Sequence, residues 1–128
     1  MKANELRIGN ILNLKGEDKF YNINGQHIAS WESPMMGEEY AAKDFLEPTP
    51  LTEEWLVKCG AKLNHQQWHE IEIKPFGKIV VKISGHKVIS ELVQNRGYSL
   101  TYPPLDYVYQ LQNLYFALTG EELLIKTT

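Results

Sequence analysis

An uncharged run near the C-terminus constrains the fold more than any other stretch of the sequence. Residues 107–120 read YVYQLQNLYFALTG and include no acidic or basic side chain. If the run is helical, at about 100° per residue, apolar side chains cover more than half of its circumference. A helix of this kind belongs inside a fold, and Gly120 marks its end. We therefore expect the other elements of the chain to pack around it.

The composition indicates a globular protein. The chain has 128 residues, of which 43% are hydrophobic and 23% charged, which suits one compact unit with up to two lobes. No stretch approaches the roughly 18 apolar residues of a membrane span, and the first residues lack the apolar core of a signal peptide. The single cysteine, Cys59, cannot form an internal disulfide and fits a reducing compartment. We expect a cytoplasmic protein that does not contact a membrane.

The N-terminal part of the chain predicts a small, curved antiparallel β unit. Apolar residues alternate over residues 5–15, as in a strand that has Leu6, Ile8, Leu12 and Leu14 on one face and a bend or bulge at Gly9. Asn24 and Gly25 are a strong hairpin signal, because both turn positions require positive φ, and residues 26–31 are expected to return as the paired strand. A helical turn is expected at residues 43–45. This order of elements is similar to that of a small SH3-like barrel.

A proline pair predicts the boundary between two lobes. Pro48 and Pro50 forbid a regular helix across this point. Directly afterwards, Thr52 is a candidate N-cap and Gly60 a candidate end for a helix of about two turns. Such a short helix is marginal alone, so it must be stabilised by burial.

The second half of the chain changes to the two-residue period of β-strands. Strands are expected at residues 68–74, 78–83, 87–93 and 98–102, with turns between them. An antiparallel meander with one apolar face needs a cover, and the uncharged helix supplies it. Residues 123–126 are long enough to return as an edge strand.

The sequence thus predicts an α+β fold. Residues 1–50 form an SH3-like β lobe in this prediction. Residues 51–128 form a short capped helix, an antiparallel β-meander, a long buried C-terminal helix and a short edge strand. We expect the two lobes to make one compact unit.

Two histidines are candidate metal ligands. His65 and His69 are four residues apart, a spacing that places two ligands on one face of a helix, and Glu70 and Glu72 follow closely. The following residues have the period of a strand, however, in which positions four apart lie about 13 Å from each other. We favour ordinary polar surface and keep the metal site as the alternative.

No motif indicates catalysis or a cofactor. The sequence lacks the G-x-S-x-G, P-loop, C-x-x-C, H-E-x-x-H and G-x-G-x-x-G patterns. Cys59 is at the expected C-terminus of a helix, where the helix dipole disfavours a thiolate, so we expect a packed thiol and not a nucleophile. We therefore predict no cofactor and favour a protein that is not an enzyme.

Aromatic residues are the best candidates for binding a partner. Trp31, Tyr98, Tyr102 and Tyr109 belong to residue types that are enriched at protein interfaces, because they bury a large area and keep a polar handle. For the aromatic residues as a group we favour packing inside the fold, between the sheet and the N-terminal lobe, over an exposed interface. The interface interpretation predicts protein–protein interaction, with another protein or with a second copy.

Nucleic-acid binding is the competing hypothesis. It would use the SH3-like lobe, with Arg7, Lys15 and Lys19 as phosphate contacts. The net charge of −3 and the presence of only two arginines disfavour it, because phosphate-binding proteins normally carry a basic face.

Three segments together resemble a known family. They read LRIGN (residues 6–10), PTPLTEEWLVKCG (48–60) and YVYQLQNLYFALTGEEL (107–123). This combination resembles a family of small uncharacterised proteins encoded by Bacteroides-type bacteria and by their phages and prophages. The resemblance implies a mobile or accessory gene and supplies no catalytic residue. We accordingly expect a non-enzymatic cytoplasmic accessory protein that acts through protein–protein interaction.

Overall fold

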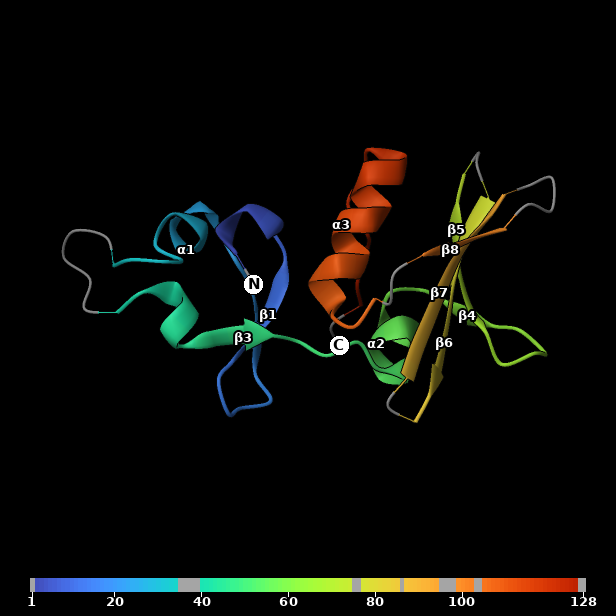
Figure 1. The fold of residues 1–128 in the computed structure, drawn as a ribbon, viewed down its shortest axis with the longest axis horizontal. Helices are drawn as coiled ribbons and strands as arrows, with labels where there is room; N and C mark the ends of the chain where they lie inside the picture. The colour runs from blue at the N-terminus through green and yellow to red at the C-terminus, as the bar shows by residue number, and fades with distance from the viewer. Residues whose placement is uncertain are drawn as a thin grey trace. The chain divides into compact units, whose positions relative to one another are not determined.

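The protein has an α+β fold in which the chain groups into two compact units (Figure 1). The computed structural model describes residues 2–34, 40–74, 77–85, 87–94, 99–102 and 105–126. Unit 1 contains Met1–Pro50 together with Tyr107–Tyr109, and unit 2 contains Leu51–Asp106 together with Gln110–Thr128. The first turn of the C-terminal helix is therefore grouped with the N-terminal residues.

Unit 1 is built on a three-stranded antiparallel sheet. The central strand is β1 (Ile11–Leu14), which pairs with β2 (Phe20–Asn22) and β3 (Leu46–Pro48). Three short helices accompany the sheet: η1 (Ala3–Glu5), α1 (Gly25–Ala29) and η2 (Ala42–Asp44). The buried core of the unit consists of Leu6, Leu12, Ile23, Trp31, Ala42, Leu46 and Tyr109.

The expected hairpin at Asn24 and Gly25 is wrong. Helix α1 begins at Gly25, and Asn24 is its N-cap, since the Asn24 Oδ1 accepts a hydrogen bond from the His27 backbone N–H at 3.0 Å. Asparagine serves equally well as a turn residue and as an N-cap. The Asn24-Gly25 dipeptide alone therefore does not decide between a hairpin turn and the start of a helix. The helix is favoured here because it buries Trp31 and partly buries Ile28, which lie three residues apart.

The expected first strand, residues 5–15, is also mostly wrong. Residues 3–5 form η1, and Gly9 adopts φ +94°, which turns the chain before β1 begins. Ile8 is consequently 67% exposed, although the alternation placed it with the core residues. Strand β3 at residues 46–48 was not expected. The SH3-like barrel stays a prediction.

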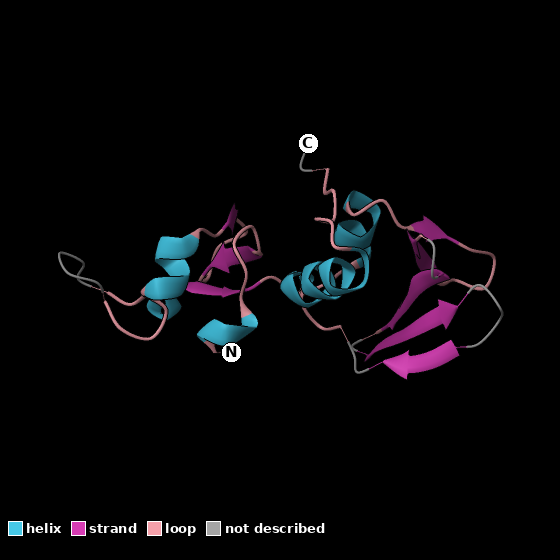
Figure 2. Ribbon diagram, turned by 90° about the horizontal axis from the view of Figure 1, so that it is seen from above, coloured by secondary structure: helices cyan, strands magenta, loops and turns pink. Residues whose placement is uncertain are grey.

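Unit 2 contains the predicted meander. Its five antiparallel strands follow the order of the sequence, and two helices accompany them (Figure 2). The helices are α2 (Glu53–Lys58) and α3 (Val108–Thr119). The strands are β4 (Lys62–Leu63), β5 (His69–Ile73), β6 (Gly77–Ser84), β7 (Lys87–Gln94) and β8 (Ser99–Tyr102).

The uncharged run forms the helix that covers the sheet, as predicted. Helix α3 ends at Gly120, which adopts φ +74°. Figure 1 shows α2 and the body of α3 on one side of the sheet, which we call the inner face. Leu111 of α3 and Ile79 and Val81 of β6 are all fully buried. Burial of these apolar side chains drives the packing.

In unit 2, the expected start of α2 is confirmed, whereas the expectation for residues 123–126 is not. Helix α2 has the expected N-cap, because the Thr52 Oγ1 accepts a hydrogen bond from the Trp55 N–H at 3.3 Å. The expected edge strand at residues 123–126 is wrong. Instead, the Lys126 N–H donates to the Lys58 carbonyl at 2.8 Å, at the end of α2, so this backbone bonds to a helix and not to the sheet.

A glycine at the start of β6 is required by the approach of the neighbouring strand. Gly77 adopts φ +148°, and a Cβ atom on it would lie 1.9 Å from the carbonyl oxygen of Val93 and 2.9 Å from the Cα of Gln94. Both atoms belong to the backbone of β7, so no side-chain rotation can relieve the contact.

We expect Gly77→Ala to destabilise the protein strongly. The loss should exceed the about 1–3 kcal/mol that a strained backbone conformation costs, because β7 must also move. Gly85→Ala is the control, since Gly85 has φ +61° but, apart from its chain neighbours, no atom of the described residues lies within 4 Å of its Cβ position, and it should lose only about 1 kcal/mol. Urea denaturation of the two variants measures the difference, and equal losses would contradict the close approach at Gly77.

Candidate functional site

The structure buries two of the four aromatic candidates. Trp31 is 2% exposed and Tyr109 is 5% exposed, and both belong to the core of unit 1. Burial also raises the pKa of the Tyr109 hydroxyl. The expectation of an exposed aromatic surface at these positions is therefore corrected, because α1 and the first turn of α3 place both side chains inward.

The other two aromatic candidates lie in or beside β8. Tyr98 is outside the described residues. Tyr102 ends β8, where its backbone pairs with Ser90, and its side chain is not among those described. Their proposed role in binding stays a prediction.

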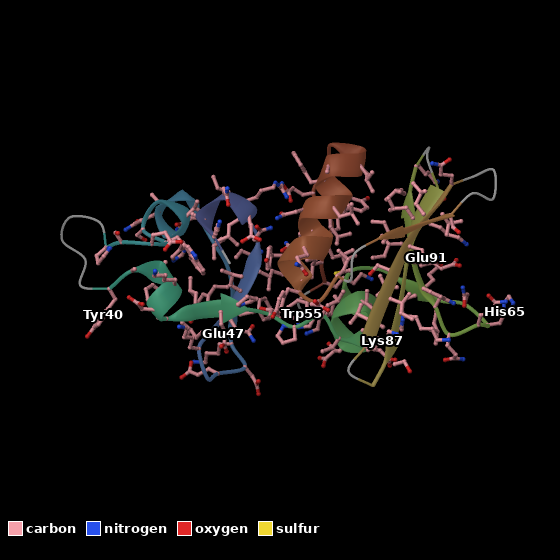
Figure 3. The ribbon with its side chains drawn as sticks, viewed as in Figure 1. Tyr40, Glu47, Trp55, His65, Lys87 and Glu91 are labelled. Atoms are coloured by element: carbon pink, nitrogen blue, oxygen red, sulfur yellow. The ribbon has the colours of Figure 1, made fainter. Side chains whose placement is uncertain are left out.

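The histidine pair is not a metal site in the described part of the chain. His65 lies in the loop between β4 and β5, exposed to solvent (Figure 3), whereas His69 is 4% exposed and lies on the inner face of β5, opposite Val81. The helical spacing is not realised, because Gln67 adopts φ +70° and turns the chain. Among the described residues, no three His, Cys, Asp or Glu side chains are grouped closely enough to hold a metal ion.

The one cysteine is a packed thiol. Cys59 caps the C-terminus of α2 and is buried. Burial raises the pKa of its thiol to about 12, so the thiolate that a nucleophile requires is scarce at neutral pH.

We expect the Cys59 thiol to resist labelling in the native protein. A thiol reagent at neutral pH should react with native Cys59 at least about 100-fold more slowly than with the denatured chain, because both the raised pKa and burial suppress the reaction. Val57→Cys is the matched control, since Val57 lies on the same helix and is exposed. Its added thiol should react at once. Rapid modification of native wild-type protein would show that Cys59 is accessible.

An ion pair organises the outer face of the unit 2 sheet. The Lys78 Nζ lies 2.7 Å from the Glu70 Oε2, and the Asn64 Nδ2 donates to the same oxygen at 2.9 Å. The hydrogen bond from Lys78 lowers the pKa of the Glu70 carboxyl, and the bond from Asn64 adds to this effect. Glu70 is therefore ionised at neutral pH, with its Oε2 bound to both Lys78 and Asn64, which suits a structural carboxylate better than a general acid or base.

The same face carries an open hollow of about 600 Å³, lined by residues of β4 to β7 that include Lys62, Glu72 and Val93. Its volume is within the range of ligand sites. Its charged side chains are of both signs, and the Glu70 carboxylate is already paired with Lys78. The lining of the hollow therefore favours neither a positively charged nor a negatively charged ligand.

We expect Lys78→Met to raise the pKa of Glu70 toward its ordinary value of 4.5. Because the native pKa lies below that value, the pair stabilises the fold above the ordinary carboxyl pKa, and this contribution is lost as the pH falls through the native pKa. Lys74→Met is the control, because the Lys74 Nζ lies 3.9 Å from the carboxylate of Glu72, so its ion pair does not involve Glu70. NMR titration of the Glu70 side chain checks both variants, and an unchanged pKa in Lys78→Met would contradict the pairing.

A row of aliphatic side chains crosses the sheet from β5 and ends at the β8 edge. The strand register places Ile71 opposite Ile79, Ile79 opposite Leu92, and Leu92 opposite Leu100. Directly opposite residues of antiparallel strands share one face of the sheet. The row is buried at Ile71 and Ile79, but its last member, Leu100, is 58% exposed.

Strand β8 is four residues long and lacks two common protections of an edge strand, charge and proline. Its residues, Ser99–Tyr102, include no charged side chain and no proline. The opposite edge, β4, is only two residues long and contains Lys62. Exposed edges are normally blunted by short length, by charge or by proline, because their backbone groups can pair with another chain. The two-residue period predicts this strand, but the interface candidates from the sequence were Tyr98 and Tyr102, and Leu100 was not among them.

The proposed phosphate contacts do not form a basic face. Lys15 and Lys19 lie in the turn between β1 and β2, and Glu17 and Asp18 lie between them. The Gly16 N–H of this turn also donates to the Glu47 carboxylate at 3.2 Å (Figure 3 labels Glu47). The charges of the turn thus balance, and this turn presents no basic face to a phosphate backbone.

No protein-family model, curated protein or solved structure matches the chain. In the described part of the chain, none of the helices has the length and apolar character needed to cross a membrane.

Proposed function

We propose that the protein is a non-enzymatic cytoplasmic accessory protein that acts by binding another protein, and that β8 is its binding edge. The observation that carries this proposal is the exposure of Leu100 on an uncharged edge strand. The resemblance of its N-terminal, central and C-terminal segments to proteins of phages and mobile elements supports an accessory role.

The binding mode is strand addition. An extended segment of the partner lies along β8 and forms backbone hydrogen bonds with it, which supply affinity. Specificity comes from the side chains beside the strand. Leu100 offers an apolar contact on the inner face, so the partner segment carries an apolar residue at the matching position.

The polar groups of unit 2 support a binding role over a catalytic one. The Glu70 carboxylate is held by Lys78 and Asn64, and the Cys59 thiol is buried with a pKa raised to about 12. Neither group is poised to transfer a proton or attack a substrate.

Leu100→Lys tests the proposal. The added ammonium would have to be buried without a counter-charge in the complex, so binding should weaken by about tenfold or more. Leu124→Lys is the matched control, because Leu124 is 86% exposed and lies outside the strands of the sheet. We expect wild type and Leu124→Lys to capture the same protein from the native host, and Leu100→Lys to lose it.

Amide hydrogen exchange of the captured complex locates the contact. The amides of β8 should gain protection, while those of α2 should not change. If all three forms capture the same protein equally, or if wild type captures none and its β8 amides stay unprotected at high protein concentration, the proposal is wrong.

A further inference from the structure

We infer that the segment accepted by β8 is the β8 strand of a second copy of this chain, paired antiparallel across a two-fold axis at Leu100. This inference rests on the proposed function of β8 as a binding edge. It names the partner, which the proposed function leaves open.

The first observation is the aliphatic row on the inner face. It runs from Ile71 and Ile79, which are buried, through Leu92, which is partly buried, to Leu100, which is 58% exposed at the edge. A two-fold axis at Leu100 places the Leu100 side chains of two copies directly opposite each other. Leucine then meets leucine, and the row continues into the second sheet without a polar residue.

The second observation is the absence of charge in β8. Across a two-fold axis, each residue lies near the same residue of the other copy or near one of its close neighbours. A charged residue would therefore approach a like charge on the other copy. Ser99–Tyr102 contains no charged residue and tolerates this symmetry. At the other edge of the same sheet, pairing of two β4 strands would bring the two Lys62 side chains together.

The length of β8 sets the strength of the dimer. Four residues span about 13 Å of strand, and such a contact buries less than the about 1,200 Å² typical of stable complexes. We therefore expect a weak dimer, which dissociates on dilution and is favoured where the protein is concentrated.

Cross-linking tests the symmetry directly. Directly opposite residues of antiparallel strands have Cα atoms about 4.5–5.5 Å apart, which a disulfide can bridge. Under mild oxidation, Leu100→Cys should therefore form a covalent dimer about tenfold faster than Leu63→Cys at equal concentration, because only the former thiols are held together. Leu63 is a matched position, being 55% exposed on the β4 edge of the same sheet. Wild type, whose Cys59 is buried, should not cross-link.

Sedimentation velocity over a range of concentrations supplies the second measurement. The mass of wild type should rise from one chain to two with concentration, and Leu100→Lys should stay a single chain, because two ammonium groups would meet at the axis. Leu124→Lys should behave as wild type.

The outcomes separate this inference from the proposed function. If wild type stays a single chain and Leu100→Cys cross-links no faster than Leu63→Cys, the second copy is not the partner. The same holds if a dimer forms that Leu100→Lys does not weaken. In both cases, Leu100-dependent capture of a different protein would leave the proposed function standing, and loss of that capture as well would overturn both.

Discussion

Burial of the inner face of the five-stranded sheet is the constraint on which unit 2 depends. Strands β5 to β7 present isoleucine and valine side chains to this face, and water must be excluded from them. Helix α3 can supply the cover because Val108–Thr119 carries no charge that would have to be desolvated. Helix α2 is only six residues long, so it forms because burial of Leu56 stabilises it.

The cover is incomplete at one edge. Ile79 and Val81 on the central strand β6 are fully buried, whereas Leu100 on β8 is 58% exposed. A meander whose strands follow in sequence order has two edge strands. The helices cover the central strands of the sheet more completely than these edges. The row of aliphatic residues that stabilises the fold thus ends at the edge that we propose as the binding site. In this way, the packing of the core and the proposed binding role share one cause.

Polar groups in unit 2 mostly have partners within the fold. The Glu70–Lys78–Asn64 cluster is satisfied, and its charges stabilise the outer face without offering free chemistry. His69 is different, because its Nδ1 is buried and forms no hydrogen bond within the described residues. Leaving such a group unsatisfied costs about 1–3 kcal/mol. The alternation of β5 forces His69 inward, and the fold tolerates the cost because Ile71 and Ile73 on the same face are buried with it.

The elements with strong local signals could be predicted from the sequence alone. The uncharged run predicted α3, the threonine cap predicted α2, and the two-residue period predicted β5 to β7. The tertiary structure decided the rest. Asn24 could begin a turn or cap a helix, and burial of Trp31 favoured the cap. Whether His65, His69 or Leu100 faces solvent depends on the strand order and on what covers the sheet, which are long-range properties. Periodicity shows which residues share a face, but only packing decides which faces and edges remain exposed.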